Sequence, residues 1–204
     1  FIGALVLIGE DSKFEMQIVD GQQRLTTITI LLAAIAQTFM DLEIKDAAEG
    51  IHYQFIEGKD DRNKAYFKLV NENPKPFFQN CIQNLKKKPG TPSTDEERLL
   101  LEAYSEFRSR LSYDSVSRDF ADLSKLKGLP KSRHVAFLEA LRNQVLRYLK
   151  VIYITVAEED DAYTIFETLN ARGLSLSAVD LIKNVIFKQL NQEHPDDFAK
   201  TEWT

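Results

Sequence analysis

The chain has 204 residues, of which 44% are hydrophobic and 28% are charged, a composition typical of a soluble globular domain. Its formal net charge of -5 excludes a surface that binds nucleic acid everywhere, because such binding needs clustered Lys and Arg. Cys81 is the only cysteine, which excludes an intrachain disulfide and a cysteine zinc site. No apolar stretch reaches the roughly 20 residues of a membrane helix, so we expect a soluble, cytoplasmic protein without a membrane partner.

The opening of the chain predicts a β-hairpin. Residues 1–8 are almost all apolar, residues 10–13 are typical of a turn, and residues 14–19 alternate apolar with polar side chains. Because a strand is already under way at Phe1, we interpret the sequence as a fragment of a longer chain.

A long amphipathic helix is predicted next. Asp20 and Gly21 end the alternation of the second strand, and the apolar side chains that follow recur every three or four residues. They are Leu25, Ile28, Leu31, Leu32, Ile35, Phe39 and Leu42. The first unit is therefore a strand, a tight turn and a helix.

The middle of the chain predicts a short strand at 66–70 and a short helix at 76–85. Residues 86–92 break regular structure, and Ser93 or Thr94 can cap a helix that carries Leu100, Leu101, Tyr104, Phe107 and Leu111. A further helix is predicted from its apolar positions Val135, Leu138, Leu141, Val145, Leu146 and Leu149.

The last part predicts a strand followed by two helices. Residues 151–156 are β-branched or aromatic and predict a buried strand, and the acids at 158–161 favour a helix start. Gly173 is the expected end of that helix, and Ser177 with Asp180 has the spacing of a capping box for the next one.

These elements predict a mixed α/β (α+β) fold: a small sheet with the strand-turn-helix unit and a large helical insertion. We expect a core of residues 1–70 and 149–190, a helical insertion at 71–148, and a linker toward a further domain at 191–204. The histidines His52, His134 and His194 lie far apart and form no ligand pair, so we expect each on the surface or beside a helix.

The turn at residues 20–27 concentrates polar chemistry at a helix start. Backbone N–H groups there attract phosphate, and Gly21 permits close approach of a ligand. Arg24 can grip phosphate oxygens, Asp20 can hold a divalent cation, and Gln22 and Gln23 can position water. Physical chemistry alone equally allows a purely structural turn, with Asp20 as the cap.

A second polar turn, at residues 166–184, joins two predicted helices. Asn170 and Arg172 stand at the end of the first helix, and Ser177 and Asp180 at the start of the next. Helix termination and capping explain most of these residues without a ligand, and the spacing alone favours that explanation.

Together the two segments resemble the two hallmark stretches of the domain of unknown function 262, a domain that carries a DGQQR motif. That family includes the N-terminal half of GmrSD-type restriction enzymes and related phosphorothioate-sensing nicking proteins. The resemblance extends over nearly the whole chain and is specific at the two motifs.

The resemblance implies a fold similar to the ParB and sulfiredoxin group and a nucleoside triphosphatase of the hydrolase class that acts with Mg²⁺. Its implied catalytic set is Asp20, Gln22, Gln23 and Arg24, with Asp20 also as the metal ligand. The implied nucleotide-binding set is Gly21, Thr26, Thr27, Asn170, Arg172 and Asp180.

The resemblance also implies partners. We expect modified DNA to be engaged through the full-length protein, together with an attached His-Asn-His-type nuclease domain. No such nuclease motif lies between 184 and 204, so this segment should not cut DNA alone. The family's segment before the first strand is also missing, so we expect weak or no hydrolysis from this segment.

Two alternatives stay open. One is a non-enzymatic, ParB-like DNA-binding module or nucleotide-gated clamp, with DNA contacts at Lys86, Lys87 and Lys88 or at Lys125, Lys127, Lys131 and Arg133. The other is an oligomerisation or docking surface on the helical insertion, with an inactive DGQQR turn.

Overall fold

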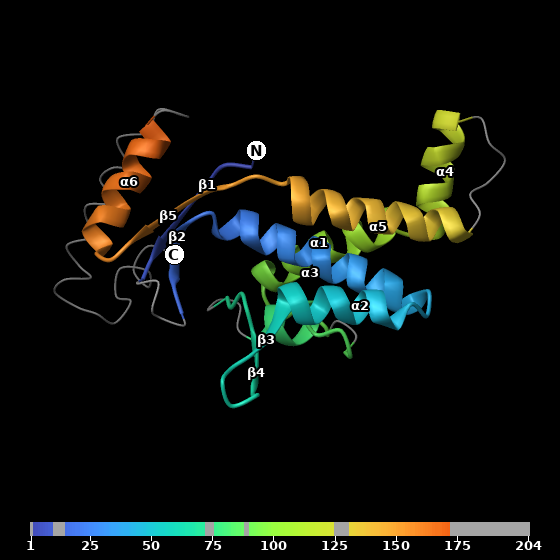
Figure 1. Cartoon of the computed structure of the whole chain (residues 1–204), viewed down its shortest axis with the longest axis horizontal. Helices are drawn as coiled ribbons and strands as arrows, with labels where there is room; N and C mark the ends of the chain where they lie inside the picture. Colours follow the sequence, from blue (N-terminus) through green and yellow to red (C-terminus); the bar gives the residue numbers. More distant parts are fainter. Residues whose placement is uncertain (1, 10–14, 72–75, 88–89, 125–130, 172–204) are drawn as a thin grey trace. The chain divides into compact units, whose positions relative to one another are not determined.

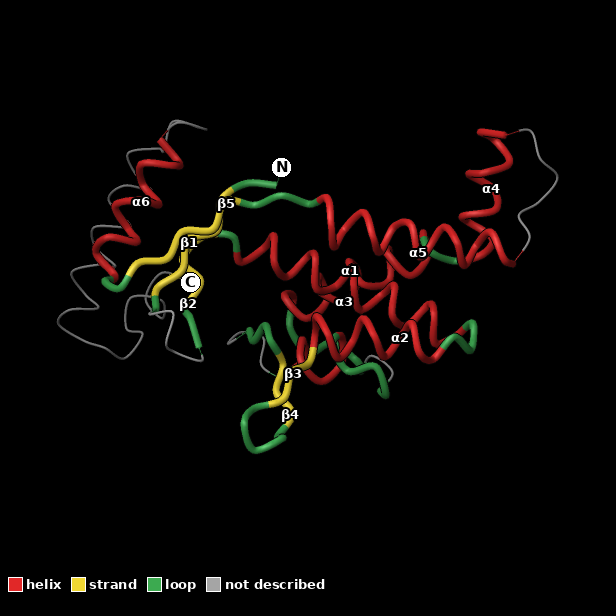
Figure 2. Tube along the Cα trace, viewed as in Figure 1, coloured by secondary structure: helices red, strands yellow, loops and turns green. Residues whose placement is uncertain are grey.

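The computed structural model describes residues 2–9, 15–71, 76–87, 90–124 and 131–171. The fold is mixed α+β, as predicted, with its elements shown in Figures 1 and 2. The chain divides into two compact units. The helical unit comprises Phe1–Gly3 and Gly21–Val151, and the sheet unit comprises Ala4–Asp20 and Ile152–Thr204.

The sheet unit contains three strands in the order β2-β1-β5. The central strand β1 (Ala4–Ile8) pairs antiparallel with β2 (Gln17–Asp20), which confirms the predicted hairpin. It pairs in parallel with β5 (Ile152–Val156), so strands far apart in the sequence are neighbours. The predicted turn at 10–13 lies outside the described residues.

The prediction that β5 is a buried strand is wrong at its start. Ile152 and Tyr153 are 53% and 54% exposed, because β5 is the outer strand in the described sheet and pairs only with β1. Helix α6 (Glu159–Ala171) contacts all three strands and buries Ala162. Its first turn holds Glu159, Asp160 and Asp161, which confirms the predicted acidic start.

The helical unit is built around α1 (Gln22–Asp41), which contacts the neighbouring helices α2, α3 and α5. These are α2 (Lys45–Ile51), α3 (Asp95–Arg110) and α5 (Lys131–Tyr148). Buried residues of α1 include Leu32, Ile35 and Phe39, as the periodicity predicts. The ends of this unit also meet: the Ile2 N–H donates to the Lys150 carbonyl oxygen at 3.0 Å.

Smaller elements complete the helical unit. The π-helix η1 (His52–Ile56) leads into β3 (Glu57–Lys59), which pairs antiparallel with β4 (Ala65–Phe67). The predicted helix at 76–85 is a π-helix, η2 (Phe78–Ile82), and α4 (Tyr113–Ser124) follows α3. The strand expected at 66–70 is present as β4, whereas α2, β3 and α4 were not predicted.

The expectation that each histidine lies on the surface or beside a helix holds for His52 only as a helix-flanking residue and is wrong for His134; the two are 5% and 1% exposed. His52 does flank α2, and its Nε2 lies 3.4 Å from a carboxylate oxygen of Glu57. His134 is inside α5, with Nε2 2.9 Å from the carbonyl oxygen of Leu111. The polar partner at Nε2 offsets part of the cost of burying each ring. His194 lies outside the described residues.

The two compact units do not have the boundaries of the predicted domains. The prediction is a core of residues 1–70 and 149–190, an insertion at 71–148 and a linker at 191–204. The reason is that α1 buries its apolar side chains among other helices. The division into folding domains therefore stays a prediction, as does the likeness to ParB and sulfiredoxin. Within the described part of the chain, no helix has the length and apolarity needed to span a membrane.

Candidate functional site

The turn between β2 and α1 depends on Gly21. Asp20 is the last residue of β2, and Gly21 is the N-cap residue of α1 with φ 96° and ψ 8°. This left-handed conformation costs an L-residue about 1–2 kcal/mol, which explains the glycine. The N-cap position therefore belongs to Gly21 and not to Asp20, and Gly21 has no side chain with which to cap α1.

The first turn of α1 exposes polar side chains and contains no acidic residue. Gln22 and Gln23 are exposed, and Thr26 is half-buried. The Thr27 hydroxyl donates to the Gln23 carbonyl oxygen at 2.8 Å. The turn therefore combines backbone donors with amide side chains, the chemistry that suits an anion.

Arg24 lies against the N-terminal segment of the helical unit. Its Nη1 donates to the Ile2 carbonyl oxygen over 3.5 Å. A Cβ on Gly3 would lie 2.1 Å from the same nitrogen, and Gly3 has φ +112°. The glycine at position 3 leaves room for the guanidinium where it lies, and Arg24 is half-buried.

Asp20 belongs to the sheet unit, where it lies opposite Val6 in the pairing of β1 and β2. It is half-buried and directly precedes Gly21 along the chain. Among the described residues, no group of three or more His, Cys, Asp and Glu could hold a metal ion.

Residues 166–171 of the second motif are described, and Asn170 is the one candidate site residue among them. It is in the last turn of α6, which ends at Ala171. Arg172, Gly173, Ser177 and Asp180 lie outside the described residues, so the nucleotide-binding role of Asn170, Arg172 and Asp180 stays a prediction.

The described residues include only part of the basic runs expected to contact DNA. Lys86 and Lys87 follow η2 and are exposed, as is Arg133 on α5. Lys131 begins α5. Lys88, Lys125 and Lys127 lie outside the described residues.

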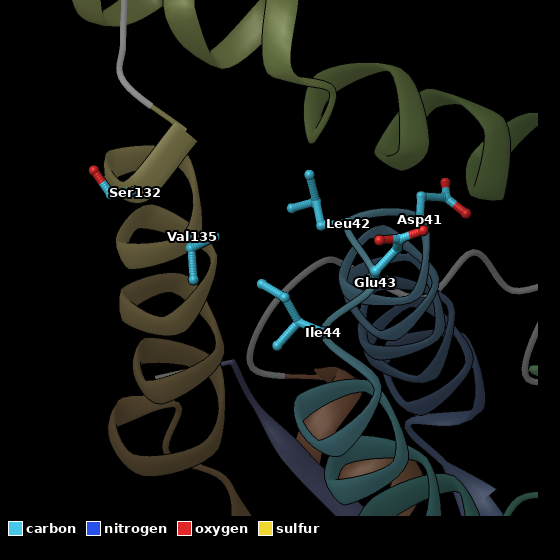
Figure 3. A pocket seen from close by; sticks show the side chains of 6 residues that line it. All are labelled: Asp41, Leu42, Glu43, Ile44, Ser132 and Val135. Carbon is cyan, nitrogen blue, oxygen red and sulfur yellow. The ribbon is translucent and has the colours of Figure 1, made fainter.

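A pocket of about 310 Å³ lies at the opposite end of α1 (Figure 3). Leu42, Ile44 and Val135 face the space between α5 and the connection from α1 to α2, with Asp41 and Glu43 beside it. Two carboxylates disfavour a polyphosphate there. No motif in the sequence marks this pocket, because of its lining residues only Leu42 and Val135 belong to a periodic pattern, and that pattern is the apolar face of a helix.

Helix α3 shows how this chain closes a helix N-terminus with its own side chains. The Thr94 hydroxyl accepts from the Glu97 N–H at 3.2 Å, and the Glu97 carboxylate accepts from the Thr94 N–H at 3.3 Å. The Ser93 hydroxyl and N–H donate to the same carboxylate at 2.6 and 2.5 Å. The hydrogen bond from the Ser93 side chain is the main cause that lowers the pKa of Glu97.

Comparison with known proteins gives one family. The family model described as GmrSD restriction endonuclease, N-terminal domain, matches residues 1–187. The match includes both motifs, at 20–27 and at 166–184. No curated protein matches the chain.

Proposed function

The chain belongs to the family of GmrSD restriction endonuclease N-terminal domains, and we propose that it binds a nucleoside triphosphate and hydrolyses it to regulate DNA restriction. One observation carries the proposal. Helix α1 begins at a left-handed glycine, exposes two amide side chains in its first turn, contains no acid there, and has Arg24 held close by.

The start of α1 suits the phosphate tail. The first N–H groups of a helix have no carbonyl partner within the helix, and the helix dipole adds roughly half a positive charge. Gly21 has no Cβ, so a phosphate oxygen could approach the backbone closely. An anion at this end would be stabilised without any acidic side chain competing from the first turn.

Arg24 would contribute charge and orientation. A guanidinium carries five N–H donors whose fork matches two phosphate oxygens. The contacts of Arg24 with Ile2 and Gly3 limit its conformations, so less side-chain entropy is lost when a phosphate binds. In hydrolysis the same charge would stabilise the transferred phosphoryl group, with no covalent intermediate.

Asp20 would hold the Mg²⁺ that accompanies the nucleotide. Mg²⁺ in nucleotide sites commonly takes one or two carboxylates and completes its octahedron with phosphate oxygens and water, so a single carboxylate suits this shared mode. When bound, the ion neutralises charge that develops on the β- and γ-phosphates. Gln22 and Gln23 would orient the attacking water.

The remaining predicted residues have smaller roles in this proposal. Thr26 and Thr27 would support the nucleotide from the first turns of α1, although the Thr27 hydroxyl already donates to Gln23. Asn170, Arg172 and Asp180 would contact the nucleotide from the second motif.

The test uses the intact protein with a panel of four nucleoside triphosphates and Mg²⁺. We expect one of them to raise Tm, because a ligand at 100 times its Kd stabilises the folded state by about 2.7 kcal/mol. Phosphate release is measured in parallel. Arg24→Ala and Asp20→Ala should abolish the shift and lower turnover by roughly 100-fold or more.

Arg110→Ala is the matched control, because Arg110 is exposed on α3 and pairs with Glu106 at 2.5 Å. It should leave both readouts unchanged. Absence of any Tm shift and of phosphate release with all four nucleotides would contradict the proposal. A shift without turnover would instead support the non-enzymatic clamp.

A further inference from the structure

The hairpin formed by β3 and β4 extends away from helices α1, α2 and α3 of the helical unit (Figures 1 and 2). Three residue pairs form its ladder, from Glu57 opposite Phe67 to Lys59 opposite Ala65. The hairpin is thus a short two-stranded ribbon with an accessible tip. None of its residues belongs to the two family motifs.

Basic side chains lie on the hairpin and next to it in an acidic chain of net charge -5. Residues 57–67 contain three Lys and Arg and three Asp and Glu, and the described residues 68–71 and 76–87 add three Lys and no acid. The exposed cations on and next to the hairpin are Lys59, Arg62, Lys64, Lys68, Lys86 and Lys87. A local basic surface of this kind attracts a polyanion even when the whole protein is acidic.

Two buried glutamines fix the base of the hairpin. Gln83 Nε2 donates to the Leu69 carbonyl oxygen at 2.8 Å, and Gln79 Nε2 donates to the Asn71 carbonyl oxygen at 2.9 Å. They are 1% and 7% exposed and belong to η2 or follow it directly. The segment leaving β4 is therefore attached to the same element that precedes Lys86 and Lys87.

The tip is fixed by Asp60. Its carboxylate accepts from the N–H groups of Arg62 at 3.0 Å and Lys64 at 2.7 Å. Asn63 has φ 63°, and its N–H donates to the Asp60 carbonyl oxygen at 2.9 Å. Arg62 and Asn63 therefore stand on an ordered turn, which lowers the entropy lost when a ligand binds.

We propose that this hairpin enters the major groove of duplex DNA. The major groove is about 12 Å wide and admits a two-stranded ribbon. Arg62 and Asn63 at the tip are the residue types that pair with guanine and adenine edges, and Lys59 and Lys64 would contact phosphates on either side. The inference rests on the proposed role in DNA restriction, and it does not depend on nucleotide binding at α1.

The first test measures binding of the intact protein to a duplex of about 30 base pairs, roughly three helical turns. Lys59→Gln with Lys64→Gln should lower the slope of log K against log salt by about 1.8, since each phosphate contact contributes about 0.9. Affinity should fall by roughly tenfold or more at low salt. Arg98→Gln with Arg110→Gln on α3 removes two exposed charges of the same sign and should change neither value.

The second test separates geometry from charge. Asp60→Ala removes a negative charge, so electrostatic attraction alone predicts tighter DNA binding. The ordered tip predicts weaker binding, because Arg62 and Lys64 lose their hydrogen-bond acceptor. Asp60→Asn keeps an acceptor oxygen and should bind DNA as tightly as the parent or more tightly.

The inference would be overturned if the intact protein bound no duplex at low salt, if the double lysine variant kept the salt slope of the parent, or if the α3 control lost as much affinity as that variant. Preference for a single strand of the same length would also overturn it. The nucleotide Tm shift should be unaffected by the hairpin variants. If DNA binding depends on the hairpin but no nucleotide binds, only the proposed function at α1 fails.

Discussion

The N-termini of α1 and α3 both present unpaired backbone N–H groups and the positive end of a helix dipole, but they are capped in opposite ways. At α3 the chain supplies Thr94 as cap, a reciprocal bond from Glu97, and three acids in the first turn. At α1 the cap is a glycine without a side chain, and the first turn has no acid. Both helices are long, with 20 residues in α1 and 16 in α3, so their dipoles are comparable.

The difference teaches where a ligand would contribute most. A carboxylate at α3 already offsets the positive end of the helix, so an external anion would gain little there. At α1 the compensating charge is missing from the first turn, and an arginine is held nearby instead. A phosphate bound at α1 would offset the positive end of this helix, as the Glu97 carboxylate does at α3.

The largest expected effect in this comparison is at Gly21. Gly21→Ala should lower the free energy of unfolding by about 1–2 kcal/mol, because the backbone at φ 96° is left-handed and an alanine Cβ is strained in that conformation. Chemical denaturation measures the loss. Gly50→Ala in α2 is the control: no atom lies within 4 Å of its added Cβ, and it should stabilise the protein by about 0.5–1 kcal/mol. An unchanged stability of Gly21→Ala would show that the glycine cap of α1 is dispensable.

Removal of the cap of α3 should have the next largest effect. Thr94→Ala should lower the free energy of unfolding by about 1 kcal/mol, because the Glu97 N–H loses its acceptor. Thr94→Ser keeps the hydroxyl and should be nearly neutral. Equal denaturation midpoints for the alanine and serine variants would contradict the assigned cap.

Making α1 resemble α3 should help stability and harm ligand binding. Gln23→Glu places an acid in the first turn of α1, which should raise the free energy of unfolding by about 0.5 kcal/mol. The same charge should reduce the nucleotide-dependent Tm shift, since it repels phosphate. The reverse change, Glu96→Gln on α3, should cost a similar amount of stability without affecting nucleotide. A nucleotide shift that survives Gln23→Glu in full would place the phosphate elsewhere.

The smallest effect concerns pH. The pKa of Glu97 is lowered in the fold by hydrogen bonds from Ser93, so its contribution to stability is present above the unfolded pKa of about 4.3. The contribution is lost as pH falls through the lowered folded pKa. Thermal melts between about pH 6 and pH 3 should therefore show a shallower decline for Glu97→Gln than for the parent protein. Parallel curves would refute this assignment.

The sequence predicted the elements that are long and periodic. The hairpin of β1 and β2, helix α1 and the capped start of α3 follow from alternation, spacing and cap residues. It did not predict α2, which has only seven residues, or the π character of η1 and η2, whose hydrogen bonding departs from the helical period. The exposure of Ile152 depends on the order of the strands, which local sequence does not contain.

At the candidate site, the sequence predicted the residue types but not their surroundings. The DGQQR segment predicts a polar turn before a helix. The structure contains that turn, and Gly21 is the N-cap residue of the helix. The contact of Arg24 with Ile2 and Gly3 joins residues more than 20 positions apart, so no local pattern reports it. The polar partner of the buried His134 is the carbonyl oxygen of Leu111 at the C-terminal end of α3, which is likewise distant in sequence.

The parallel pairing of β1 with β5 has a consequence for folding order. These neighbours are separated by the whole helical segment, so their pairing requires closure of a very long loop, which is entropically costly. The Ile2 N–H, before β1, donates to the Lys150 carbonyl oxygen, before β5, so the parallel alignment of the two segments extends beyond the strands. We therefore expect α1 amides to gain hydrogen-exchange protection before those of β1 during refolding, and simultaneous protection would argue against this sequence of events.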